Sequence, residues 1–144
     1  MRSAAIVLAA LVSTHAASPA LACERADFEA AVDQAAAALR DLNLKHRPVF
    51  QDKLRALKEK RGWSHDQFLK EAAPLVKDDQ TDVYDQTSSD MLAAITELGQ
   101  EGAEARTPDC TLLDTLRGHM ATLVEAQTAK WAYLFGRLDV ELAR

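Results

Sequence analysis

Apolar residues recur every three or four positions along most of the chain beyond residue 24, as they do in amphipathic α-helices. The pattern is clearest over 107–144, where one stripe holds Leu113, Leu116, Met120, Leu123, Gln127, Trp131, Leu134, Leu138 and Leu142. Thr107 suits the capping position, and Pro108 is tolerated in the first helical turn. Asp109 places a negative charge near the positive end of the helix dipole. We therefore predict one long helix in this segment.

The segment 24–61 carries a similar stripe, which continues through a proline. Its members are Phe28, Val32, Ala35, Leu39, Leu42, His46, Phe50, Leu54 and Leu57. Pro48 removes a helical hydrogen bond, yet the spacing keeps the same phase on both sides of it. We therefore expect one kinked helix that ends at Gly62 in the left-handed conformation.

A third helical segment is predicted over 64–101. Ser64 and Gln67 have the spacing of a capping box, which marks its start. Gly99 and Gly102 are expected to end it, because glycine is a poor helix former.

The interior of this third segment favours helix less strongly. Pro74 lies inside it, and 77–90 is rich in Asp, Thr, Ser and Gln, whose side chains compete for backbone hydrogen bonds. We expect the helix to split near Thr87–Ser89, where a new cap is available.

The two cysteines favour one arrangement of these helices. In a three-helix bundle of 24–61, 64–101 and 108–143, the first and last helices begin at the same pole, so Cys23 and Cys110 can form a disulfide. In a four-helix up-down bundle the two cysteines would lie at opposite poles. The prediction is an all-α, elongated antiparallel three-helix bundle with proline-interrupted helices, and the four-helix up-down bundle is the alternative.

The first 22 residues have the features of a secretory signal peptide. Arg2 precedes a short apolar stretch, 4–12, and a small-residue cleavage site ends at Ala22. This predicts a signal peptide, 1–22, and a single periplasmic or secreted domain, 23–144, with no membrane-spanning segment. An N-terminal lipid anchor at Cys23 is the alternative, although Leu21 lies two residues before that cysteine and a lipobox needs leucine three before it.

The charges are unevenly distributed. The formal net charge of −5 argues against a nucleic-acid partner. Residues 45–61 include seven Lys and Arg against two acids, whereas 78–104 includes eight acids and no Lys or Arg. Such segregation is typical of solvated faces or of surfaces that bind a partner.

Two groups of residues could act as ligands. His119 and Met91 on facing helices could ligate a haem, and His46 with Asp78 and Asp79 could bind a transition metal. A partly buried histidine and a solvated acidic face explain the same residues more simply, so we expect no bound cofactor. The metal- or haem-carrier remains the alternative function.

Signatures of catalysis are missing from the sequence. It has no G-x-S-x-G, no H-E-x-x-H and no glycine-rich phosphate loop. We therefore predict that the protein is not an enzyme. The leading hypothesis is an exported binding module that acts on another protein, as chaperone, inhibitor or immunity-type proteins do.

Two surfaces could bind such a partner. Trp63 lies beside Lys58 and Arg61, where it could anchor a partner, although a contact with its own helix start is the simpler interpretation. Gly118 and Gly136 belong to a second stripe of mostly small residues on the last helix. We expect the alanine-rich first helix to cover this stripe, and a homodimer or partner helix is the alternative.

Overall fold

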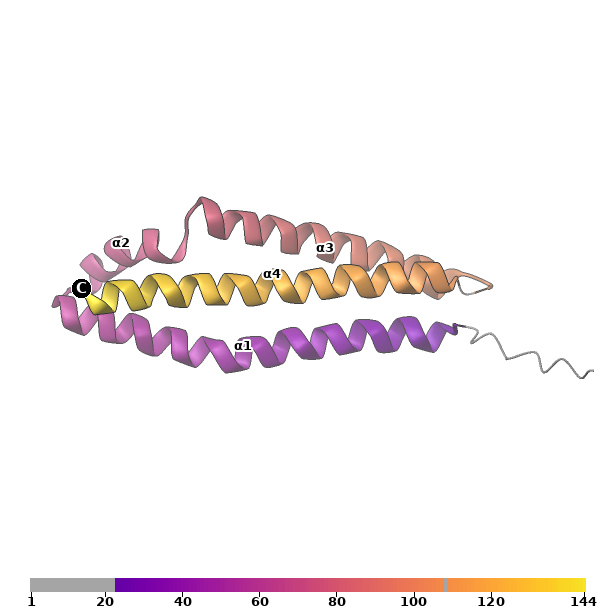
Figure 1. Cartoon of the computed structure of the whole chain (residues 1–144), viewed down its shortest axis with the longest axis horizontal. Coiled ribbons are helices and arrows are strands. Elements are labelled where there is room, and N and C mark those ends of the chain that lie inside the picture. The colour runs from indigo at the N-terminus through magenta and orange to yellow at the C-terminus, as the bar shows by residue number, and fades with distance from the viewer. Residues whose placement is uncertain (1–22, 108) are drawn as a thin grey trace, which may run out of the picture.

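The computed structural model describes residues 23–107 and 109–144, and Figure 1 shows that they form an elongated helical bundle. This part of the chain has four helices, α1 (Arg25–Arg61), α2 (His65–Val76), α3 (Asp79–Glu104) and α4 (Cys110–Ala143). The all-α prediction is confirmed. The number of helices matches the four-helix alternative, but α2 and α3 follow one another along the same side of α4, so the helices form three rods. The predicted signal peptide lies outside the described residues.

The helix α1 continues through its proline, as expected. Glu24 caps its start, and the Asp27 carboxylate accepts a hydrogen bond of 2.7 Å from the Glu24 N–H. Pro48 lies inside the helix, and Figure 1 shows α1 bowed along its length. Gly62 ends it with φ of 64°, a conformation that glycine adopts without strain, and this confirms the prediction.

The interruption between α2 and α3 lies ten residues earlier than predicted. Lys77 and Asp78 are extended, and Asp78 begins α3 through a capping box with Thr81. The expected split at Thr87–Ser89 is wrong, because α3 runs through these residues without a break, and the Thr87 and Ser88 hydroxyls bond carbonyl groups four residues back within the helix. The Ser88 Oγ, for example, donates to the Tyr84 carbonyl at 2.8 Å.

Both glycines that were expected to end this segment lie inside α3, which continues to Glu104. A Cβ atom at Gly102 would lie 2.3 Å from the Cδ1 of Phe28, so the missing side chain allows α1 and α3 to approach closely. The helix α4 is capped by Asp109, whose carboxylate accepts from the Thr111 N–H at 2.8 Å, and not by Thr107 as predicted. The prediction for Pro108 falls outside the described residues.

The core follows α4, which lies between α1 and α3 in Figure 1. Near the start of α4 it is formed by Cys23, Phe28, Ala31, Ile95, Leu113, Leu116, Met120 and Leu123. Toward the other end, Leu57, Leu134 and Leu138 are buried. The stripe predicted on the last helix therefore does supply much of the core.

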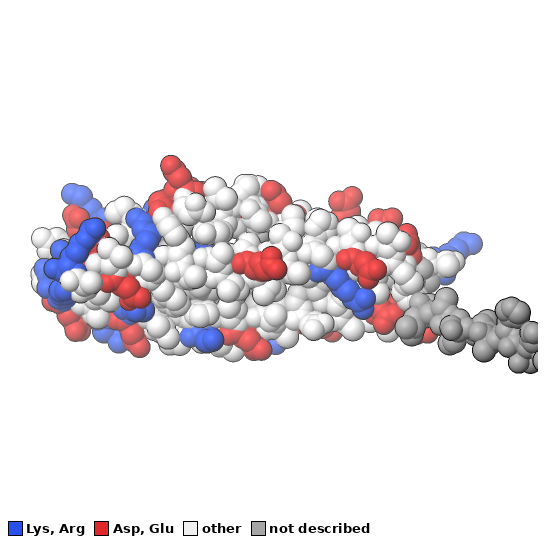
Figure 2. Space-filling model, viewed as in Figure 1, with Lys and Arg blue, Asp and Glu red and all other residues white. Residues whose placement is uncertain are grey.

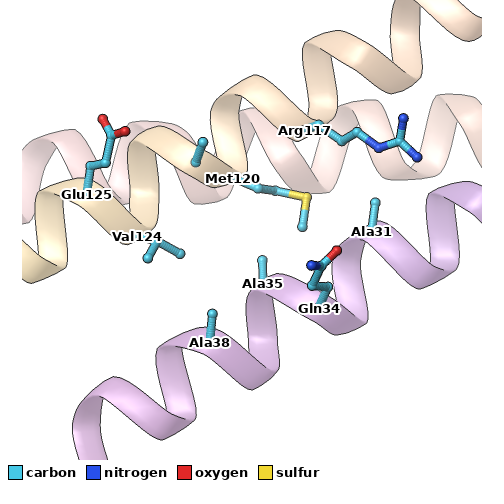
Figure 3. Close-up of a pocket in the computed structure, with 9 residues that line it drawn as sticks. Ala31, Gln34, Ala35, Ala38, Arg117, Met120, Val124 and Glu125 are labelled. Carbon is cyan, nitrogen blue, oxygen red and sulfur yellow. The ribbon is translucent and has the colours of Figure 1, made fainter.

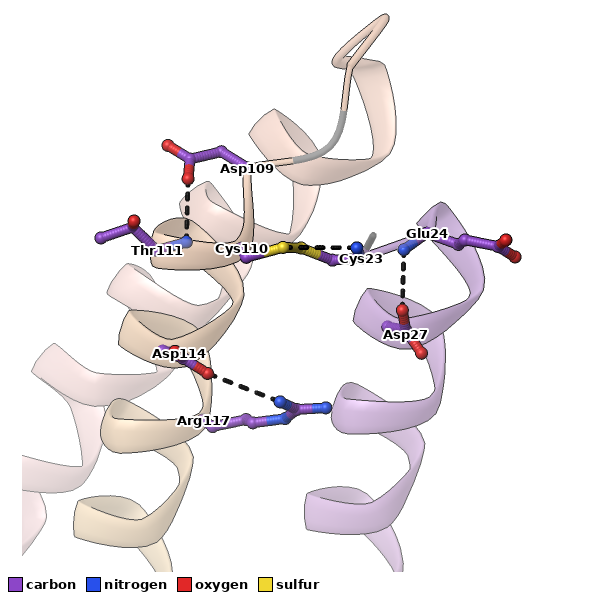
Figure 4. The surroundings of a disulfide bond; sticks show 8 residues. All are labelled: Cys23, Glu24, Asp27, Asp109, Cys110, Thr111, Asp114 and Arg117. Atoms are coloured by element: carbon purple, nitrogen blue, oxygen red, sulfur yellow. Dashed lines mark hydrogen bonds and ion pairs between the residues drawn. A yellow bond between two sulfur atoms is a disulfide. The ribbon is translucent and has the colours of Figure 1, made fainter. Parts of the chain in front are cut away.

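A disulfide joins the N-terminal end of α1 to the start of α4 (Figure 4). The Cα atoms of Cys23 and Cys110 are 5.4 Å apart, within the usual range for a disulfide. The predicted pairing and the shared pole of the two helix starts are thus confirmed. Across residues 23–107 and 109–144, no helix is both long and apolar enough to span a membrane.

Candidate functional site

An open groove of about 410 Å³ runs between α1 and α4, close to the disulfide end (Figure 3). Its described lining residues are Ala31, Gln34, Ala35, Ala38, Arg117, Met120, Ala121, Val124 and Glu125. Ala31 and Met120 form a buried floor, each with 6% of its surface exposed. Figure 3 shows Met120 reaching from α4 toward the alanines of α1.

The alanine-rich sequence of α1 explains the groove. Ala31, Ala35 and Ala38 lie at spacings of four and three residues, so they share the face that α1 turns toward α4. Their methyl groups leave space where larger side chains would fill the seam. The Cys23–Cys110 disulfide joins the two helices at the end of this seam, which keeps the walls of the groove in place.

The rim of the groove is polar. Gln34, Arg117 and Glu125 are exposed, and Glu125 points away from α1 in Figure 3. Arg117 pairs with Asp114 at 3.5 Å on the surface of α4 (Figure 4). An apolar floor with a charged, solvated rim can accept apolar side chains of a partner and orient it through the rim.

The structure places His46 in an aromatic cluster farther along the same seam. The ring centroids of His46 and Trp131 lie 5.7 Å apart in a stacked arrangement, and those of His46 and Phe135 lie 5.3 Å apart. Phe50 meets the edge of Trp131 at 5.6 Å. His46 therefore contributes to the packing of α1 against α4.

Asp78 fixes the start of α3 to α4. Its carboxylate accepts hydrogen bonds from the Tyr133 hydroxyl at 2.6 Å and the Thr81 N–H at 2.9 Å, and it pairs with Arg137. The Tyr133 hydrogen bond, followed by the Thr81 N–H, lowers the pKa of Asp78, and the Arg137 charge adds to this effect. The same hydrogen bond raises the pKa of Tyr133. Asp79, in contrast, is exposed.

The predicted cofactor ligands gain no support from this geometry. Met91 packs against the core cluster, and His119 is half-buried on α4. Among residues 23–107 and 109–144, no three His, Cys, Asp or Glu side chains come together in a group that could hold a metal ion. The carrier function therefore stays a hypothesis from the sequence.

Lys58, Arg61 and Trp63 lie where α1 ends, and the two basic residues have partners within the chain. The Arg61 guanidinium pairs with Glu141 at 3.0 Å, and the Lys58 Nζ lies 5.8 Å from the centre of the Phe68 ring. Trp63 is half-buried. Figure 2 shows basic side chains gathered at this end of the molecule, beside acidic ones. These contacts explain Lys58 and Arg61 by local structure, and the role of all three residues toward a partner stays a prediction.

The two glycines of the small-residue stripe on α4 are not covered by α1. Gly118 and Gly136 are exposed, and a Cβ atom at either would have no neighbour within 4 Å among the described residues. The expectation that the first helix covers these glycines is therefore wrong. Figure 2 shows a largely uncharged area over the middle of α4. The alanines of α1 instead face Met120, Ala121 and Val124, which belong to the neighbouring face of α4.

The groove itself was not predicted from the sequence. The alanine run of α1 was the one sequence signal for a groove. Which α4 residues lie opposite these alanines depends on how the two helices are aligned. Tyr133 and Arg137 were missed for the same reason.

Comparison of the chain with protein-family models, with curated proteins and with solved structures finds no match.

Proposed function

We propose that this protein is an exported, non-enzymatic helical module that binds another protein, in the manner of a chaperone, an inhibitor or an immunity protein. The α1–α4 groove carries the proposal, because its floor is apolar and it is open to solvent. An amphipathic helix binds such a groove by laying its apolar face into it. The expected partner element is therefore a helix with apolar residues at spacings of three and four.

The chemistry of the groove supports binding in preference to catalysis. The nine described residues that line it offer no thiol, hydroxyl or imidazole side chain, and the carboxylate of Glu125 points away from α1 in Figure 3. A disulfide supports export, because such bonds persist in oxidising compartments.

Site-specific photo-crosslinking tests this proposal. A photoreactive amino acid at Ala121, an exposed residue that lines the groove, should form a discrete adduct with one other protein in the cells that produce this chain. The matched control places the same amino acid at Ala93, an exposed alanine of α3 outside the groove, where no adduct of that mass should form. Mass spectrometry of the adduct then identifies the partner.

Two results would contradict the proposal. The first is the same set of adducts from both positions, which would mean that the groove has no selectivity. The second is no adduct at Ala121 when the labelled protein is folded and exported. An adduct with a second copy of this chain would assign the groove to self-association and would also reject the proposed partner.

A further inference from the structure

The outer face of α1 carries charges of opposite sign in its two halves. Glu29, Asp33, Arg40, Leu44 and Arg47 are spaced by four, seven, four and three residues, which places them on one stripe of the helix. All five are exposed. Leu44 has 68% of its surface exposed to solvent, the largest exposed fraction among the large apolar residues described. In Figure 1, α1 forms one edge of the bundle with α4 on its inner side, and the acidic half of the stripe, Glu29 and Asp33, also borders a groove between α1 and α3.

The charges of this stripe are largely unused within the described chain. Within residues 23–107 and 109–144, Asp33, Arg40 and Arg47 have no ion-pair partner. Glu29 pairs with Arg25 at 3.2 Å, but both side chains are more than 60% exposed, so this pair contributes little to stability. Bringing these groups to a partner would therefore break few existing interactions.

The charges of this stripe are complementary to those of a second, antiparallel copy of the same helix. If a second α1 lies antiparallel to the first, Asp33 faces Arg40 of the partner copy and Glu29 faces Arg47 of the partner copy. The midpoints of the two pairs both fall within one residue of Ala37, so a single two-fold axis near Ala37 satisfies both. Each pair then occurs twice, as an isologous interface requires. Ala30 and Ala37 on this side of α1 have only methyl groups and allow close approach.

We propose that two copies of this chain form an antiparallel homodimer through the outer face of α1. Four intermolecular ion pairs, Glu29 with Arg47 and Asp33 with Arg40 in each direction, set the register, and Leu44 of each copy is buried at the contact. A single pair of helices buries little area, so the dimer is weak and depends on salt.

The dimer leaves the α1–α4 groove open, since Ala31, Ala35 and Ala38 lie on a different face of α1. Each dimer therefore presents two grooves. Two linked sites strengthen binding to a partner that offers two helices, through a raised effective concentration. The proposal concerns a separate surface and does not rest on the function proposed for the groove.

Charge reversal in two complementary variants tests the dimer. One variant, Glu29→Lys/Asp33→Lys, makes the stripe wholly basic, and the other, Arg40→Glu/Arg47→Glu, makes it wholly acidic. Sedimentation velocity of the exported, oxidised protein is measured from about 10 µM to about 1 mM, where weak interfaces are populated. The unmodified protein should shift from monomer to dimer and return to monomer as salt rises from about 50 mM to about 500 mM.

Each variant alone should associate at least tenfold more weakly, because like charges meet at every pair. An equimolar mixture should associate again, since all four pairs are complementary in the mixed dimer. The control Glu97→Lys/Glu101→Lys, on exposed positions of α3, changes the net charge as much as Glu29→Lys/Asp33→Lys and should leave association unchanged. Circular dichroism confirms that each variant remains helical.

Three results would overturn the proposal. They are a protein that stays monomeric over the whole concentration range at low salt, self-association that survives in both reversed variants, and folded variants that fail to associate when mixed. A dimer that the reversals do not weaken would place the interface elsewhere on the molecule.

Discussion

At the end of the bundle where α1 and α4 begin, a disulfide and apolar contacts hold the helices together, whereas polar side chains join α3 to α4 toward the opposite end. The first region contains Cys23 bonded to Cys110 and the buried Phe28, Leu116 and Leu123. In the second, Asp78 binds Tyr133 and Arg137, Asp85 pairs with Lys130, and Gln127 donates to the Ser88 hydroxyl at 2.7 Å.

The polar region also joins α1 to α4 near their C-terminal ends. Lys53 pairs with Asp139, and Arg61 pairs with Glu141. The buried leucines of this end, Leu57, Leu134 and Leu138, support these contacts. Because the charged partners remain partly exposed, each pair contributes at most about 1 kcal/mol to stability. We therefore expect the disulfide end to be the last part of the bundle to open.

The groove lies at the disulfide end, which we expect to be the more stable of the two. Binding sites on rigid, well-packed elements need less ordering when a partner arrives, so more of the contact energy appears as affinity. The disulfide holds the two helices that wall the groove, so we expect the groove to keep its shape without a partner.

Removing the disulfide should have the largest effect. The double substitution Cys23→Ser/Cys110→Ser releases a crosslink between residues separated by 87 positions, and it should lower the free energy of unfolding by about 2–5 kcal/mol. Urea denaturation of the variant and the unmodified protein measures the loss. In hydrogen exchange, the N-terminal half of α1 should lose more protection than its C-terminal half.

A variant as stable as the unmodified protein would contradict this account of the disulfide end. So would a loss of amide protection that is greatest around Arg61 and Glu141.

Substitution of Asp78 should have a smaller effect, confined to the polar end. Its pKa lies below the ordinary value, so the carboxylate stabilises the folded state at neutral pH. That stabilisation is lost as pH falls below about 4 and through the lowered pKa. Asp78→Asn should therefore be less stable than the unmodified protein at pH 7, and the difference should narrow toward pH 2. Chemical denaturation across this range measures it.

The exposed neighbour Asp79 provides the control. Asp79→Asn should follow the pH dependence of the unmodified protein more closely than Asp78→Asn does. If the two variants behave alike, the contacts of Asp78 with Tyr133 and Arg137 do not stabilise this end.

The sequence predicts the helices well because their signals are local. Gly62, the Ser64–Gln67 capping box and the stripe along α4 each depend on residues a few positions apart, and each is found in the structure. The shared pole of Cys23 and Cys110 follows from the three-helix arrangement, which the two cysteines themselves favoured over the four-helix alternative. These features can be predicted without knowing which faces of the helices are in contact.

The remaining features depend on the alignment of helices with one another. Thr87 and Ser88 are as suitable for a cap as Asp78, but Asp78 also bonds Tyr133 and Arg137 across the bundle, which favours the break at Lys77–Asp78. The groove depends in the same way on which α4 residues stand opposite the alanines of α1. Local patterns in the sequence do not show which residues of two neighbouring helices lie opposite one another.

The most direct test of the proposed function is the affinity of the cross-linked partner for variants of the groove. Calorimetric titration should show that Ala121→Arg, which adds a long charged side chain to the groove, weakens binding at least tenfold. Ala93→Arg, the same change on the outer surface of α3, should bind as the unmodified protein does. Equal affinity of the two variants would show that the partner binds elsewhere, and it would contradict the assignment of the α1–α4 groove as the binding site.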